Sequence, residues 1–275
     1  MRFEWRDTRV FAFRGIELPC VASLLPDTRV VTKAGQGQVA GIRPANRQTM
    51  IIKRTLWPLS LLFSHLFGSG FTSRGVGELI RKYHKDCEAF LEIGCGSTQL
   101  RRYLPPGQWY NAIDLAYSEF HLRRVLGRPH VNLAMGSATD IPLADGQATT
   151  VVASEVFEHI PRIEDAILEV RRVMQRGGKL ICSIPNNFYY KYSVLGENPD
   201  HVNKWTYQGF PAFMAGFGFR LLESQRKGYW VPLGRWLPIA RNFSPLRECY
   251  LPITPRNEYY TSNFFYVFEL TDESA

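Results

Sequence analysis

The sequence has few cysteines and no pair of them at a metal-binding or redox spacing. Its five cysteines are odd in number, and no two stand in a C-x-x-C arrangement. This argues against a disulfide framework and against a cysteine-based zinc site. The first residues mix charges into every turn, so we expect no secretory signal sequence there. A reducing, cytoplasmic setting is therefore expected.

Long apolar runs are also missing. The one candidate for membrane contact is residues 56–71, LWPLSLLFSHLFGSGF, which contain a proline, a histidine and two glycines. This stretch is shorter than the roughly 20 apolar residues that a spanning helix needs. We expect no transmembrane segment and interpret 56–71 as an apolar helix packed on the domain. A helix in the plane of a membrane or against a partner is the alternative.

The composition is that of a folded protein. The 275 residues are 45% apolar and 13% aromatic, which excludes disorder for most of the chain. The net charge is +8, and residues 1–54 hold ten Lys and Arg against four Asp and Glu. A basic segment of this kind is typical of a solvated surface, and it can also attract phosphates or anionic lipids.

From residue 89 onward, apolar strands alternate with amphipathic helices. We expect strands at 89–93, 109–113, 150–153 and 179–184, and helices at 73–84 and 163–174. Gly177 and Gly178 are expected to stop the second helix. The alternation predicts a mostly parallel sheet with helices on both faces. Ligands in such sheets bind beyond the carboxyl ends of the strands.

A glycine turn follows the first of these strands. In FLEIGCGSTQL, residues 90–100, Glu92 ends the strand, and Gly94 and Gly96 let the backbone turn closely against a ligand. The turn lacks the longer glycine spacing of a dinucleotide fingerprint. A dehydrogenase is therefore disfavoured.

Two further acids follow the next two strands. Asp114 ends the second strand, where a carboxylate can accept both hydroxyls of a ribose. Asp140 follows the third strand, where it can accept from an exocyclic amine while Ile141 packs on an adenine face. Three acids after successive strands, in this order, indicate a binding site for an adenosine-containing cofactor.

The motifs LEIGCG, NAID, GSATDIPLADG, VVASEVFEHI and LEVRRVMQRGGKLICSIPN together resemble the class I S-adenosylmethionine-dependent methyltransferases. The resemblance implies an α/β fold with a Rossmann-like seven-stranded sheet whose last strand is antiparallel, and S-adenosyl-L-methionine as the cofactor. The cofactor-binding residues it implies are Glu92, Gly94 and Gly96 at the methionine part, Asp114 at the ribose, Ala138, Asp140 and Ile141 at the adenine, and Ser154 and Glu155 at the sulfonium.

The resemblance covers roughly residues 73–270. We therefore expect an N-terminal extension at 1–72, basic and ending in the apolar helix, and a methyltransferase domain at 73–275. An aromatic and proline-rich insertion is expected at about 229–259. Two departures from the family pattern are Thr98, where a third glycine is common, and Ala148-Thr149, where Phe-Asp is usual.

The stretch EVFEHI offers two kinds of chemistry. His159 is a candidate base for a hydroxyl proton, and its alternative role is to cap or pack the following turn. The E-x-x-E-H spacing also resembles that of quinone-biosynthesis O-methyltransferases and small-RNA 2′-O-methyltransferases. By that resemblance Glu155, Glu158, His159 and the downstream His201 would hold a magnesium-like ion. The absence of a metal is the main expectation, and this ion is the alternative.

We expect methyl transfer to a small molecule or a glycan or lipid precursor, at oxygen. No Asn/Asp-Pro-Pro-Tyr motif is present, and Cys95 and Cys182 are expected to be core thiols. Two aromatic stretches, 186–205 and 229–259, suggest an apolar or ring-shaped acceptor. RNA 2′-O-methylation is the first alternative, since nucleic acid is disfavoured but open, and a non-catalytic scaffold is the second. Peripheral membrane contact would involve 56–71.

Overall fold

The computed structural model describes residues 10–11, 70–86, 88–117, 125, 128–231, 249–251 and 253–271. Its strands are β1 (Val10–Phe11), β2 (Phe90–Ile93), β3 (Tyr110–Asp114), β4 (Val131–Met135), β5 (Ala148–Ser154), β6 (Met174–Pro185), β7 (Phe219–Lys227), β8 (Tyr229–Val231), β9 (Cys249–Leu251) and β10 (Asn263–Leu270). Eight of them form one sheet in the order β1-β4-β3-β2-β5-β6-β10-β7, and β8 pairs with β9.

The direction of the strands confirms the expected sheet. β4, β3, β2, β5 and β6 pair in parallel. The last strand, β10, lies between β6 and β7 and is antiparallel to both. Without β1, these seven strands are the Rossmann-like sheet that the resemblance implied. The short β1 adds an antiparallel edge beside β4.

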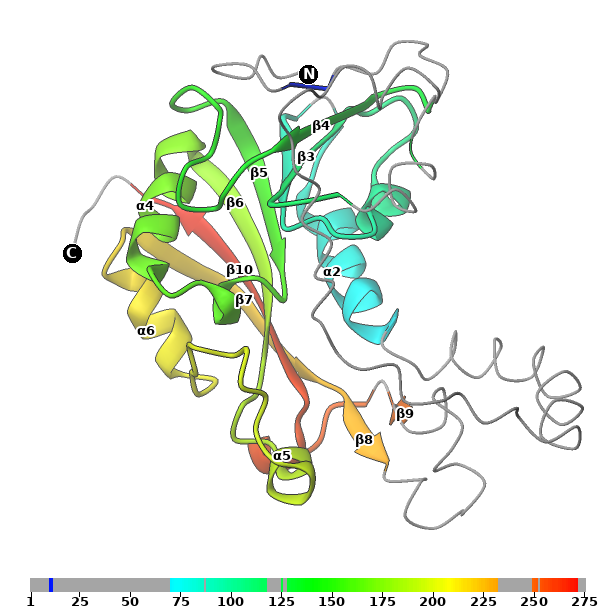
Figure 1. Ribbon diagram of the computed structural model, residues 1–275, viewed down its shortest axis with the longest axis vertical. Helices are drawn as coiled ribbons and strands as arrows, with labels where there is room; N and C mark the ends of the chain where they lie inside the picture. Colours follow the sequence, from blue (N-terminus) through cyan, green and yellow to red (C-terminus); the bar gives the residue numbers. More distant parts are fainter. Residues whose placement is uncertain are drawn as a thin grey trace, which may run out of the picture.

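Helices cover both faces of the sheet (Figure 1). They are α2 (Gly70–Tyr83), α4 (Ile163–Val173), α5 (Tyr190–Leu195) and α6 (Gly209–Ala215), with short 3-10 turns η2 (Gln99–Tyr103), η3 (Phe157–His159) and η4 (Glu258–Tyr260). α2 packs on one face with the apolar side chains of one core cluster. α4 and α6 pack on the opposite face in a second cluster. Apolar side chains at helical spacing, the signal used above, therefore mark the faces that are buried.

Two glycines allow α2 to pack closely, one against the sheet and the other against η2. A Cβ on Gly75 would lie 2.6 Å from Cε1 of Phe265 in β10. A Cβ on Gly77 would lie 2.5 Å from the ring of Tyr103. Glycine costs helix stability in a helix interior, so these two positions are explained by packing. The helix expected at 73–84 is confirmed and begins three residues earlier, at Gly70.

The helix-stopping role expected for Gly177 and Gly178 was wrong, although the helix itself was predicted to within one residue at its end. α4 stops at Val173, where Met174 already has an extended backbone with ψ of 144°. Gly177 and Gly178 lie inside β6, which begins at Met174. The pairing of β6 with β5 shifts register in this stretch, and Gly177 has φ of 71°. The glycines therefore accommodate an irregular strand start rather than a helix end.

The proposed N-terminal extension falls mostly on residues that the structure does not describe. Of the apolar stretch at 56–71, only Gly70 and Phe71 are described, and they begin α2. The remainder of the expected apolar helix lies outside the described residues. Among the helices that are described, none has the length and apolar character needed to cross a membrane.

Candidate active site

The turn after β2 contains three residues in left-handed backbone conformations. Gly94, Gly96 and Thr98 have φ values of 66°, 43° and 56°. A Cβ on Gly94 would lie 2.5 Å from Cγ2 of Val156, whereas nothing lies within 4 Å of one on Gly96. Gly94 therefore packs tightly, and Gly96 faces open space. Thr98 adopts the conformation that the family's third glycine would adopt freely. This conformation costs free energy in a β-branched residue.

Asp114, at the end of β3, reaches across this turn. Its Oδ2 accepts a hydrogen bond of 2.7 Å from the backbone N–H of Gly96. Leu115 follows Asp114 and is 72% exposed. Met135 in β4, which is paired with Asp114 in the sheet register, is 43% exposed. A half-exposed carboxylate beside two exposed apolar side chains can receive a polar ring with hydroxyls and a flat apolar ring next to it. Sequence reasoning missed Leu115 and Met135, although an apolar residue directly after a strand-ending acid was visible.

Glu92 lies below the same turn and is buried. Its Oε2 accepts a hydrogen bond of 2.6 Å from the hydroxyl of Tyr110. Burial is the main reason that the pKa of Glu92 is raised to about 8, and the negative charge of Asp114 adds to the effect. The thiols of Cys95 and Cys182 are also buried, which confirms them as core residues.

The three residues predicted to surround the adenine lie in the loop after β4 and differ in their exposure to solvent. Asp140 is exposed, and its backbone N–H donates to Ser137 O at 3.1 Å. Ala138 packs partly against the core. Ile141 is only 1% exposed, and its backbone N–H donates to Glu169 Oε2 at 2.9 Å. Contact of Ile141 with an adenine therefore stays a prediction.

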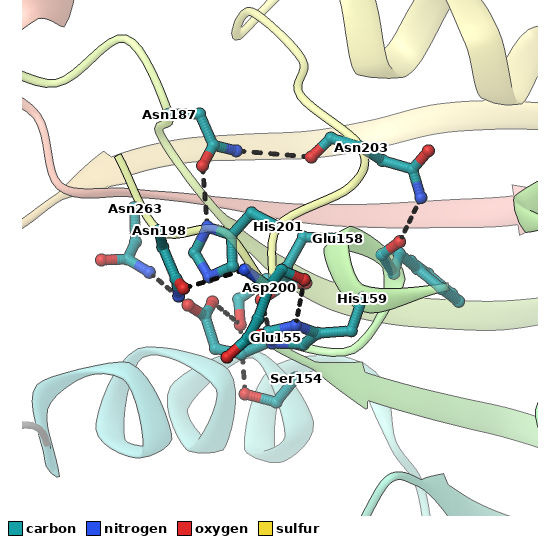
Figure 2. Close-up of polar contacts among 12 residues, drawn as sticks. Ser154, Glu155, Glu158, His159, Asn187, Asn198, Asp200, His201, Asn203 and Asn263 are labelled. Carbon is teal, nitrogen blue, oxygen red and sulfur yellow. Dashed lines mark hydrogen bonds and ion pairs between the residues drawn. The ribbon is translucent and has the colours of Figure 1, made fainter. Parts of the chain in front are cut away.

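Ser154, the last residue of β5, and Glu155, which follows it, belong to a hydrogen-bonded row that joins β5, β6 and β10 (Figure 2). Ser183 in β6 shares a 3.1 Å hydrogen bond with Ser154 and donates to Glu155 Oε1 at 2.8 Å. Asn263 in β10 donates to Glu155 Oε2, also at 2.8 Å. Glu155 has a positive φ of 56°. Burial raises the pKa of its carboxyl, while the hydrogen bonds from Ser183 and Asn263 oppose that shift. Sequence reasoning missed Ser183 and Asn263.

Beyond Glu155, the turn η3 brings Glu158 and His159 against His201. One ligand-type atom from each of these three residues lies within 4.8 Å of the others. The rings of His159 and His201 meet edge to face with centroids 5.0 Å apart (Figure 2). The structure thus joins three of the four residues of the predicted E-x-x-E-H set. Glu155 is not in this group, and its two oxygens accept hydrogen bonds from Ser183 and Asn263.

Glu158 is the most buried of the three. Its side chain is 1% exposed, and neither carboxylate oxygen has a hydrogen-bond partner among the described residues. Nε2 of His159 lies 3.6 Å from Oε1 of Glu158. Burial, reinforced by the negative charge of Glu155, raises the pKa of Glu158 well above its usual range.

The segment that carries His201 is fastened to η3 by Asn203. The side-chain amide of Asn203 donates to the carbonyls of Phe157 and Ile160 at 2.9 and 2.7 Å. Its backbone N–H donates to the carbonyl of Glu158 at 3.1 Å. These bonds satisfy carbonyls of a short turn that has few internal partners. Asn203, which sequence reasoning did not single out, therefore fixes the position of His201 relative to Glu158.

The two aromatic stretches form one ring cluster beside this turn. Tyr190 in α5 lies within ring-contact distance of Tyr189, Tyr229, Trp230, Tyr259 and Tyr260. Tyr192, also in α5, meets the ring of His201 edge on with centroids 6.4 Å apart. Tyr259 and Tyr260 remain 44% and 40% exposed. Part of the expected insertion, residues 232–248 and 252, lies outside the described residues.

The sheet order, the glycine turn and the acid at the end of β3 define a class I methyltransferase domain. Residues 91–182 match the family model described as "Methyltransferase domain". This part of the chain is therefore a methyltransferase domain, and its fold is that of the class I, S-adenosylmethionine-dependent methyltransferases.

Two proteins of similar sequence show how much of the chain is matched. The ubiquinone/menaquinone biosynthesis C-methyltransferase UbiE of Rubrivivax gelatinosus is 38% identical over 56 residues, 20% of this chain and 22% of that protein. A probable S-adenosylmethionine-dependent methyltransferase of Mycolicibacterium smegmatis is 30% identical over 101 residues, 36% of this chain and 39% of that protein. The match thus spans well under half of either relative.

A solved structure extends the likeness in fold. The putative methyltransferase BH2331 of Bacillus halodurans superposes with a TM-score of 0.52 at 16% identity. It covers 72% of this chain and 99% of that structure. At this identity the likeness concerns the fold alone.

Proposed function

We propose that the protein transfers a methyl group from S-adenosylmethionine to an oxygen atom of a small molecule or of a glycan or lipid precursor. The observation that carries the proposal is the hydrogen bond from Gly96 N to Asp114 Oδ2. It holds a half-exposed carboxylate over an open glycine turn, at the carboxyl ends of the parallel strands where such sheets bind ligands.

The residues present fit this cofactor. Asp114 would accept the ribose hydroxyls, and the exposed side chains of Leu115 and Met135 offer apolar surface for the adenine beside it. Glu92, Gly94 and Gly96 would surround the methionine part, Ala138, Asp140 and Ile141 the adenine, and Ser154 and Glu155 the sulfonium. When bound, the cofactor supplies an electrophilic methyl group, so the protein's task is to align an acceptor with it.

The acceptor side of the proposal depends on His159 and the ring cluster. Nδ1 of His159 is engaged with the carbonyl of Asp200 at 2.9 Å, which leaves Nε2 to take a proton from an acceptor hydroxyl. The imidazole is 44% exposed and therefore accessible. The exposed rings of Tyr259 and Tyr260 favour an apolar or ring-shaped acceptor. The named relative UbiE is a C-methyltransferase. For this chain, the accessible imidazole of His159 supports transfer to oxygen, because it can remove the proton of an acceptor hydroxyl.

The test is a transfer assay with methyl-labelled cofactor and three acceptor classes: phenols and catechols, lipid-linked glycan precursors, and RNA. We expect label on a phenol or sugar oxygen, identified as a methoxy group by NMR. Transfer should be lost in Asp114→Ala and retained in Asp165→Ala, a matched surface carboxylate paired with Arg162 at 3.0 Å. Label on carbon alone would contradict O-methylation, and folded protein with no transfer to any class would contradict the enzyme.

A further inference from the structure

A buried carboxylate without hydrogen bonds stands against two imidazoles. Both oxygens of Glu158 are buried and lack hydrogen-bond partners in the described part of the chain. An unpaired carboxylate in such a place costs free energy unless a cation or donor compensates it. The side chains that face it are His159 and His201.

The hydrogen bonds of the two histidines decide which nitrogen of each ring carries the proton and which keeps a lone pair for a metal ion. Nδ1 of His159 lies 2.9 Å from the carbonyl oxygen of Asp200. Nδ1 of His201 lies 2.7 Å from Oδ1 of Asn187. Carbonyl oxygens only accept, so each Nδ1 carries the proton and each neutral ring keeps its lone pair on Nε2.

The amide of Asn187 is itself held in place. Its Nδ2 donates to the carbonyl of Asn203 at 3.4 Å, which directs Oδ1 toward His201. Histidines whose outer nitrogen donates to a carbonyl are the usual arrangement around protein-bound metals, because the bond fixes both tautomer and ring direction.

We propose that Glu158, His159 and His201 bind a divalent cation of the zinc type, such as Zn²⁺, Co²⁺ or Fe²⁺. Two imidazole nitrogens and one carboxylate suit these ions and leave positions open, whereas Mg²⁺ takes oxygen ligands. The three ligand atoms lie within 4.8 Å of one another, so small side-chain rotations close the site. His159 is 44% exposed and provides a path of entry.

This assignment changes the predicted metal set in two ways. Glu155 is left out, because it lies outside the group of three residues whose ligand atoms come within 4.8 Å of one another. The second change is the metal itself: an ion that prefers nitrogen ligands takes the place of the magnesium-like ion in the prediction. The site itself is independent of methyl transfer. Its use, to hold an oxygen of the acceptor at an open position, rests on the proposed function, and a bound ion would replace the role of His159 as base.

The experiment is a metal titration of the full chain without a histidine tag, after removal of bound metal by a chelator. Zn²⁺ is added in competition with a chromophoric chelator, and Co²⁺ is added separately to record its visible absorption. We expect one Zn²⁺ per chain and a Co²⁺ spectrum of nitrogen and oxygen coordination. Glu158→Gln, His159→Ala and His201→Ala should each weaken Zn²⁺ binding by about tenfold or more.

The matched control is His130→Asn, at an exposed histidine whose φ of 58° asparagine tolerates. It should bind Zn²⁺ like the original chain. Circular dichroism checks that each variant is folded. The proposal is overturned if the folded chain takes up no Zn²⁺, if all three variants bind it unchanged, or if equimolar Mg²⁺ displaces it. Titration of the same samples with S-adenosylhomocysteine reports the cofactor site separately, so either site can fail alone.

Discussion

The imidazoles of His159 and His201 lie edge to face with ring centroids 5.0 Å apart, although they come from different segments of the chain. His159 is carried by η3, directly after β5, and His201 by the segment between α5 and α6. The amide of Asn203 and its backbone N–H join the two segments at the carbonyls around Glu158. These hydrogen bonds therefore fasten the segment that carries His201 to the turn η3.

The first prediction concerns the residue that orients His201. Asn187→Leu removes the acceptor of the Nδ1 hydrogen bond, so Zn²⁺ affinity should fall by about tenfold. Asn187→Asp keeps an oxygen acceptor and should restore most of the affinity. Competition titration with a chromophoric chelator measures both. Equal affinities in Asn187→Leu and the original chain would show that the imidazole does not depend on this bond.

The second prediction separates close packing from backbone strain at Gly94. Gly107, in the turn before β3, is the comparison because it has a positive φ but no close neighbour. Gly107→Ala places a Cβ at φ of 80° with no atom within 4 Å, whereas Gly94→Ala at φ of 66° also meets Val156 at 2.5 Å. We expect Gly107→Ala to lower the free energy of unfolding by about 1–2 kcal/mol. Gly94→Ala should lose about 1–3 kcal/mol more because of the overlap. Urea denaturation measures the difference, and equal losses would contradict the tight packing of Gly94.

The third prediction is a pH dependence of stability caused by Glu92. The pKa of Glu92 is raised to about 8 in the folded protein. In an unfolded chain, the pKa of a glutamate is about 4.3. The folded state therefore holds a proton that the unfolded state releases. The resulting stabilisation is complete below about pH 4, decreases as the pH rises, and is lost above about pH 8.

Glu92→Gln has no such proton, and its amide oxygen can still accept from Tyr110. The decrease in unfolding free energy between pH 5 and pH 8 should be smaller in Glu92→Gln than in the original chain. Urea midpoints at the two pH values provide the comparison. Parallel decreases in both proteins would mean that Glu92 is ionised in the fold.

Much of the fold could be predicted because burial follows the sequence pattern. The four residues of β2 are all buried, and the apolar face of α4 follows helical spacing from Ile163 to Val173. The end of α4 could not be predicted from Gly177 and Gly178. Those glycines serve an irregular strand start, which depends on how β6 pairs with β5.

The candidate site was predictable where its residues follow strands in sequence, as Asp114 does. It was not predictable where contact depends on register between distant strands. Ser183 meets Glu155 because Ser154 and Ser183 are paired in β5 and β6. Asn263 joins them from β10, which returns antiparallel beside β6. These two hydrogen bonds hold the carboxylate of Glu155, and the sequence contains no local signal for them.

The central claim is that Asp114 and the glycine turn bind S-adenosylmethionine, and calorimetric titration with S-adenosylhomocysteine tests it most directly. The original chain and the surface control Asp165→Ala should bind the ligand with the same affinity. Asp114→Ala should bind it about 10- to 100-fold more weakly, because hydrogen bonds to a charged group are lost. Unchanged affinity in folded Asp114→Ala, or no binding by the original chain, would contradict the account.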